Sequence, residues 1–140
     1  MRVAVLICVL AAAVGCGAGV SSTGATAGPT SLTITFWPQG TTKAAAGTWT
    51  LRCAPAEGTL PRPGRTCAKL AALPKPFAPT PKDMACAELY GGPQTAVVKG
   101  TFRGERVFAT LRRRNGCEIA RFDKHAFLVP GYRAGTGGEA

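Results

Sequence analysis

The chain has 140 residues, enough for one domain with a modest hydrophobic core. Its 17 lysines and arginines outweigh 7 acidic residues and give a net charge of +10. This balance serves solubility or attracts an acidic partner. The chain shows no helix-turn-helix pattern, no paired aromatic platform and no zinc-ligand spacing, so we expect no nucleic-acid partner.

The N-terminal segment has the pattern of a signal peptide. Arg2 precedes an unbroken apolar run over residues 3–14, which is too short to span a bilayer. Ala13-Val14-Gly15-Cys16 resembles a lipobox, in which Cys16 becomes lipidated; Ala25-Thr26-Ala27 offers ordinary cleavage after Ala27 instead. We favour the lipobox and an exported protein of the cell envelope, anchored to the membrane through Cys16. The expected parts are a signal peptide (1–15), a flexible tether (16–30), a folded domain (31–130) and a mobile tail (131–140).

The cysteines also point to export. Cys8 lies in the signal segment, which leaves four cysteines in the domain: Cys53, Cys67, Cys86 and Cys117. An even number in an exported domain predicts two disulfides, and three connectivities are open. The long, irregular gaps between them argue against a zinc site, and we expect no metal or other cofactor.

The apolar patterns predict five strands, at 32–36, 48–53, 95–102, 106–112 and 126–129. A helix is expected over 67–73, with Thr66 as its cap and Pro74 as its end, and a short helical turn after Cys117. Four prolines in residues 74–83 predict a stiff surface connection. The run Arg112-Arg113-Arg114 is interpreted as a solvated strand edge; attraction of an acidic protease or an anionic envelope is the alternative.

An enzyme is not expected. Hydrolytic catalysis needs a nucleophile and a base held by the fold, and the only serines, at positions 21, 22 and 31, lie in or beside the tether. The domain cysteines are expected to be oxidised. His125 is the sole histidine and is interpreted as a surface or turn residue beside Asp123. No two carboxylates are spaced for acid–base work.

Three regions of the domain carry related motifs. Residues 50–61 read Thr-Leu-Arg-Cys-Ala-Pro-Ala-Glu-Gly-Thr-Leu-Pro, and Cys-Ala-Lys-Leu-Ala-Ala begins at Cys67. The segment Cys86-Ala87-Glu88-Leu89-Tyr90 comes next, and residues 100–107 with Asn115-Gly116-Cys117-Glu118 complete the set. The pattern resembles the actinobacterial Streptomyces subtilisin inhibitor family over about residues 32–130, with all four cysteines in register.

The resemblance implies an α+β fold, with a five-stranded antiparallel sheet and two helices packed on one face. It implies the disulfides Cys53–Cys67 and Cys86–Cys117, and a homodimer made through the sheet. It also implies an inhibitor of extracellular serine proteases. Such an inhibitor presents an already extended loop to the protease, and the bridge at Cys86 stiffens this loop.

By the same resemblance, the scissile bond is Glu88–Leu89 and Glu88 enters the specificity pocket of the protease. Cys86, Ala87 and Tyr90 are then flanking contacts. Because an unpaired carboxylate in an apolar pocket is costly, Glu88 predicts a glutamate-preferring target. A shifted register, with Leu89 or Ala87 in the pocket, would favour chymotrypsin-like or elastase-like enzymes.

Two departures from the family pattern lie next to this bond. Ala87 stands where the family usually has proline, and Gly91-Gly92-Pro93 makes the following segment one residue longer. Both changes predict a looser loop. The alternative function is therefore a lipid-anchored envelope-binding module that keeps the inhibitor fold without inhibiting.

Overall fold

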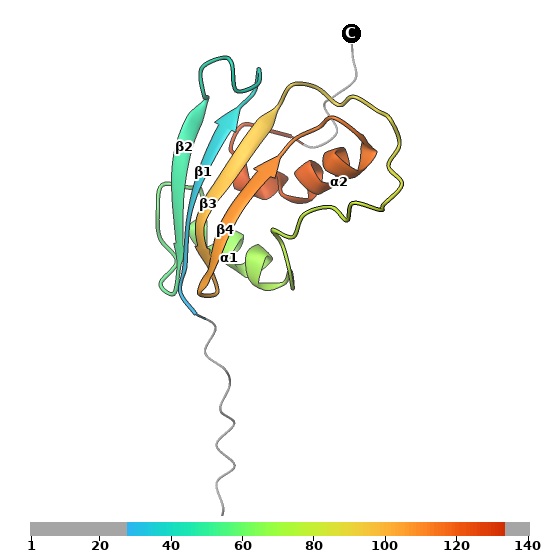
Figure 1. Ribbon diagram of the computed structural model, residues 1–140. Helices are drawn as coiled ribbons and strands as arrows, with labels where there is room; N and C mark the ends of the chain where they lie inside the picture. The colour runs from blue at the N-terminus through green and yellow to red at the C-terminus, as the bar shows by residue number, and fades with distance from the viewer. Residues whose placement is uncertain (1–27, 134–140) are drawn as a thin grey trace, which may run out of the picture.

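The computed structural model describes residues 28–133, which form an antiparallel sheet backed by two helices (Figure 1). The strands are β1 (Thr30–Trp37), β2 (Gly47–Cys53), β3 (Thr95–Phe102) and β4 (Glu105–Leu111), in the spatial order β2-β1-β3-β4. The helices α1 (Pro63–Ala71) and α2 (Gly116–Lys124) lie on the same face of this sheet. The α+β class is confirmed.

The expected signal peptide, Cys16, both cleavage sites and nearly all of the tether and tail lie outside these residues. Between positions 28 and 133, no helix is both long enough and apolar enough to cross a membrane.

The prediction of a fifth strand is wrong, because in the described part of the chain the sheet has four strands. The apolar run expected to form it instead makes a short 3-10 helix, Ala126–Leu128, after α2. Its backbone bonds are local, from the Leu128 amide to the His125 carbonyl and from the Val129 amide to the Ala126 carbonyl. Leu128 and Val129 are buried all the same. A short apolar run can be buried as a strand or as a helical turn, and its periodicity does not separate the two.

The core lies between the sheet and the helices because the strands alternate apolar and polar residues. On β1, Leu32, Ile34 and Phe36 face inward, while Thr33 and Thr35 face outward. The other strands follow in register, with Leu32 opposite Leu51 and Ile34 opposite Val98. The full set of buried apolar residues is Leu32, Ile34, Phe36, Leu51, Leu60, Leu70, Ala96, Val98, Ala109, Leu111, Phe122, Leu128 and Val129.

Each helix begins beside a residue that favours a helix N-terminus, Pro63 for α1 and Asn115 for α2. Pro63 occupies the first turn of α1, so this helix starts before Thr66, which is buried inside it. The Cys53–Cys67 disulfide attaches α1 to the end of β2. Asn115 caps α2, because its side-chain oxygen accepts the Glu118 amide proton at 2.9 Å. With this cap, α2 is a full helix rather than the expected short turn.

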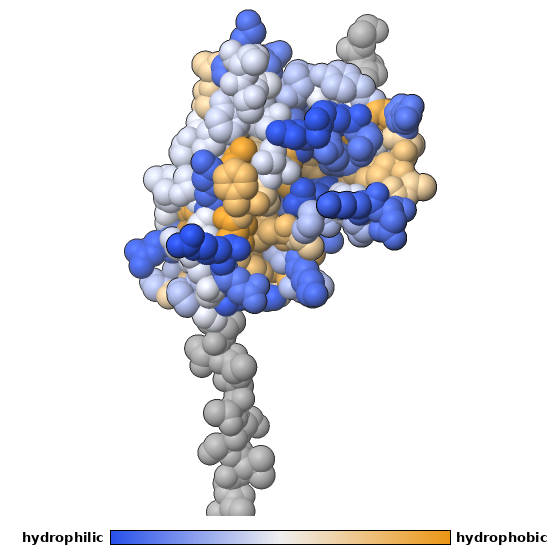
Figure 2. Space-filling model, in the orientation of Figure 1, coloured by the Kyte–Doolittle hydropathy of each residue, from blue (hydrophilic) through white to orange (hydrophobic). Residues whose placement is uncertain are grey.

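A long connection, residues 72–94, joins α1 to β3 without forming a helix or a strand, and runs past α2 along the outside of the domain (Figure 1). Its first part is fixed: the Phe77 ring packs edge-on against Phe102, and the Arg121 guanidinium donates to the Phe77 carbonyl. The middle part projects from the domain. Apolar colour gathers on the surface there, at the right of Figure 2.

His125 is buried, not a surface residue as expected; only 1% of it is exposed. Its Nδ1 lies 2.7 Å from the Arg121 carbonyl oxygen on α2, and its Nε2 lies 2.5 Å from the Pro76 carbonyl oxygen. The ring therefore links the long connection to α2. Burial lowers the pKa of His125, against the opposing effect of the two carbonyl hydrogen bonds.

This lowered pKa predicts a stability loss in mild acid. The unfolded chain takes up the His125 proton below about pH 6.5, whereas the folded protein resists it, so acid favours unfolding. We expect the free energy of unfolding to fall as the pH is lowered from about 7.5 to about 5. Urea titrations should show this slope for the wild type and a flatter profile for His125→Gln, which lacks the titrating group. An equal slope in both proteins would contradict the assignment.

Candidate functional site

The segment around Glu88 is an exposed stretch of the long connection. Glu88, Leu89 and Tyr90 are all exposed, Leu89 by 58% and Tyr90 by 71%. Large apolar side chains are seldom left this open on consecutive positions, which suggests a surface made for contact with another protein. Met84 adds a further exposed apolar side chain nearby.

The first tie between this loop and the domain is the Cys86–Cys117 disulfide, with its Cα atoms 5.4 Å apart. It joins the loop to the first turn of α2. The carbonyl oxygen of Ala87 accepts the Gly116 amide proton at 2.8 Å, which adds a backbone bond beside the disulfide. The chain is therefore fixed immediately before Glu88.

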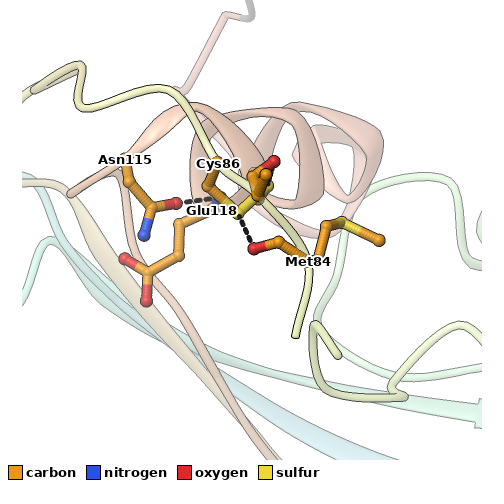
Figure 3. The surroundings of a disulfide bond; sticks show 6 residues. Met84, Cys86, Asn115 and Glu118 are labelled. Atoms are coloured by element: carbon orange, nitrogen blue, oxygen red, sulfur yellow. Dashed lines mark hydrogen bonds between the residues drawn. A yellow bond between two sulfur atoms is a disulfide. The ribbon is translucent and has the colours of Figure 1, made fainter. Parts of the chain in front are cut away.

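Figure 3 shows how the disulfide lies against the helix start. Cys86 sits over the first turn of α2, close to Asn115, and the Glu118 carboxylate points away from the sulfur atoms. The Met84 carbonyl oxygen approaches the Cys86 sulfur at 3.5 Å; an oxidised cysteine has no proton, so this is a contact rather than a donated hydrogen bond.

The second tie holds Gly91, two residues after Leu89. The Gly91 amide donates to the Arg113 carbonyl oxygen at 2.8 Å, and the Arg113 Nε donates to the Gly91 carbonyl oxygen at 2.9 Å. Gly91 also packs closely on α2, because a Cβ atom added to it would lie 2.7 Å from Ile119 Cγ1. This glycine allows the close approach of loop and helix, and it fixes the loop where the sequence suggested looseness.

The backbone is turned at Glu88 rather than fully extended. The Leu89 amide donates to the Ala87 carbonyl oxygen at 2.9 Å, which closes a three-residue turn centred on Glu88. The Ala87 carbonyl thus accepts two protons, from Leu89 and from Gly116. The Glu88 side chain is exposed at this turn, and the backbone is bent there with alanine at position 87.

Charged groups line a hollow of about 670 Å³ beside the loop, among them Lys82, Glu88, Arg114 and Glu118. The Glu118 carboxylate binds Arg114 with both oxygens, at 3.3 Å from Nε and 3.3 Å from Nη2, and accepts the Arg114 amide proton. Burial raises the pKa of Glu118, but the bonds and charge of Arg114 outweigh it and hold this pKa below its usual value. Glu118 and Arg114 therefore form a charged pair at the foot of the loop.

Arg113 is the buried residue at this site that the sequence interpretation missed. It is not part of a solvated strand edge, since only 4% of it is exposed. A signal was present: Ala109, Leu111 and Arg113 alternate with outward residues, so Arg113 continues the inward-facing row of β4. Arg112 and Arg114 are exposed, as expected.

The residues expected to form the site fall into two groups. The structure brings Cys86, Ala87, Glu88, Leu89 and Tyr90 together on one projecting loop, with Cys117 beneath it. Cys53 and Cys67 are paired with each other, apart from this loop, and support α1. The observed disulfides are the pairing that the family resemblance implies.

Comparison with known proteins identifies the scaffold. Residues 28–113, more than half of the chain, match the family described as subtilisin inhibitor-like. The chain belongs to the subtilisin inhibitor-like family. Family membership supports protease inhibition rather than catalysis.

A solved structure and the curated sequences complete the comparison. The crystal structure of Streptomyces caespitosus sermetstatin in complex with Bacillus licheniformis subtilisin is 27% identical, with a TM-score of 0.49. The match covers 75% of this chain and 100% of the matched chain in that crystal structure. No curated protein sequence matches the chain.

The packing of Gly91 predicts that a single methyl group will disturb the loop of this family member. Gly91→Ala places a Cβ against Ile119 and should destabilise the protein by about 1–3 kcal/mol, as overpacking usually does. Gly64→Ala is the matched control, because a Cβ at Gly64 meets open space in α1 and should be neutral or stabilising. Urea unfolding measures both variants. Equal stability of Gly91→Ala and wild type would show that the close approach is not required.

Proposed function

We propose that this protein inhibits an extracellular serine endopeptidase by presenting the Glu88–Leu89 bond as a substrate that is held after docking. The observation that carries the proposal is the arrangement of the loop: three exposed residues in a row, fixed on one side by Cys86–Cys117 and on the other by the two bonds between Gly91 and Arg113. A loop fixed at both ends loses little conformational entropy on binding, so more of the contact energy becomes affinity.

The target we propose is a glutamate-preferring enzyme. Glu88 projects from the turn as the exposed side chain at the centre of the loop, and its carboxylate needs a pocket with basic groups or strong hydrogen-bond donors. An apolar pocket of the subtilisin or chymotrypsin kind would leave this charge unpaired. With Leu89 in the pocket instead, such enzymes would become the better targets.

Exchanging the charge at position 88 tests the pocket assignment. Glu88→Lys should create inhibition of trypsin-like enzymes and weaken inhibition of a glutamate-preferring enzyme by about a hundredfold or more, because an uncompensated buried charge costs about 3–5 kcal/mol. Stoichiometric titration against glutamate-, lysine- and aromatic-preferring proteases measures the change. Glu105→Lys makes the same charge change at the exposed β3–β4 turn and should leave the profile as it is.

The outcomes of this panel separate the functions. Inhibition with an unchanged profile in Glu88→Lys would mean that another residue fills the pocket. A wild-type protein that inhibits no enzyme in the panel would contradict the proposed function and favour the envelope-binding module without inhibitory activity.

We also propose that the protein is exported and anchored through a lipid on Cys16, outside the described residues. Two disulfides within one small domain support an oxidising compartment. Mass spectrometry of the mature N-terminus should find a chain that begins at a diacylglyceryl-modified Cys16. A chain that begins at Gly28 would contradict the anchor and support free secretion.

A further inference from the structure

A disulfide attaches the loop to the domain before the Glu88–Leu89 bond, and hydrogen bonds attach it after that bond. This difference becomes important if the Glu88–Leu89 bond is cut. The carboxyl side of the cut stays attached by a covalent bond, the Cys86–Cys117 disulfide. The amine side has no disulfide between the cut and β3; the first residue after it that the domain holds is Gly91, through hydrogen bonds to Arg113. Leu89 and Tyr90 between them are exposed.

The fate of the inhibitor depends on the α-amine that Leu89 gains when the bond is cut. The protease serine attacks the Glu88 carbonyl carbon, the bond to the Leu89 nitrogen breaks, and an ester forms while Leu89 gains a free α-amine. If the amine attacks the ester, the peptide bond is restored and the serine recovers its hydroxyl. If water attacks first, Glu88 becomes a free carboxylate and the cut chain is released. A tethered amine has a high effective concentration, which favours restoration.

Contacts with Asp123, Tyr132 and two aromatic rings hold the Arg113 guanidinium in one position. Its Nη1 lies 2.5 Å from Asp123 Oδ1 on α2 and also contacts the Tyr132 hydroxyl, which donates to the same carboxylate oxygen at 2.6 Å. The guanidinium lies over the rings of Phe122 and Tyr132. Burial and the bond to Asp123 raise the pKa of Tyr132 to about 12, so its hydroxyl keeps its proton at neutral pH.

We propose that Arg113 is the positioning residue that retains the amine side of the cut loop, and that it sets how long inhibition lasts rather than which protease is recognised. This inference rests on the proposed function. Arg113 binds both polar backbone groups of Gly91. Its carbonyl oxygen accepts from the Gly91 amide, and its side chain donates to the Gly91 carbonyl oxygen. Asp123 and Tyr132 keep the guanidinium in place behind it.

The test follows inhibition over time with the full-length protein and the protease that it inhibits best. Arg113→Met removes the donor to Gly91 with little loss of side-chain volume, and Arg113→Lys keeps the charge but loses the guanidinium fork. In the first minutes, both variants should still titrate the protease. Later, the Met variant should be cut at Glu88–Leu89 about tenfold faster than wild type or more, as expected for loss of a charged hydrogen bond. The Lys variant should fall between.

Two controls separate positioning from general destabilisation. Arg112→Met removes the exposed neighbouring arginine and should be cut at the wild-type rate. Tyr132→Phe leaves Arg113 in place but removes one support, and should accelerate cutting less than Arg113→Met. Mass spectrometry under reducing conditions should find a single cut, at Glu88–Leu89, at a temperature where each variant is folded by circular dichroism. Cuts scattered over the chain would indicate unfolding and overturn the inference.

Hydrogen exchange in the free protein gives a readout without protease: the Gly91 amide should exchange faster in Arg113→Lys than in wild type. Equal exchange, or equal survival of Arg113→Met and wild type in the complex, would overturn the inference while the proposed function stands. A wild-type protein that inhibits no protease would overturn both.

Discussion

The Cys86–Cys117 disulfide is the joint on which the exposed loop depends, because it attaches a segment without helix or strand to the first turn of α2. The helix is itself fixed by Phe122, which is fully buried and packs against Phe36 near the end of β1, with 6.4 Å between ring centroids. Support therefore passes from the loop through one helix to an inner strand of the sheet. Rigidity at Glu88 is a property of the whole core rather than of the loop's own residues.

Arg113 adds a support of a different physical kind. Burying a guanidinium is unfavourable unless every side of it is compensated, and here a carboxylate, a hydroxyl, a backbone carbonyl and two aromatic rings provide that compensation. Removing any one of these partners leaves the buried charge of Arg113 uncompensated. Arg113 and its partners therefore stabilise the protein together. They connect the end of β4, α2, the C-terminal segment and the loop.

Four strands could be expected from the apolar patterns and the disulfide pairing from the family resemblance, whereas the supports of the site could not. Thr33 and Thr35 alternate with buried residues strongly enough to place β1 within two residues at its start and one at its end. Residues 126–129 misled because a short apolar run fits either a strand or a turn. Arg113 stood in a run of three arginines, where charge suggested solvent, although its inward register was the better guide. Its bonds to Gly91 join residues far apart in the chain, which no local pattern encodes.

The exposure of Glu88, Leu89 and Tyr90 has an evolutionary consequence. These three side chains contribute little to the buried core, so a lineage can exchange them without weakening the fold. The fixed parts, from Cys86 and Gly91 inward, can be inherited unchanged while the exposed tip diverges. Descendants of one gene can therefore change the protease that they recognise with little loss of stability. Paralogues should differ first at these three exposed residues.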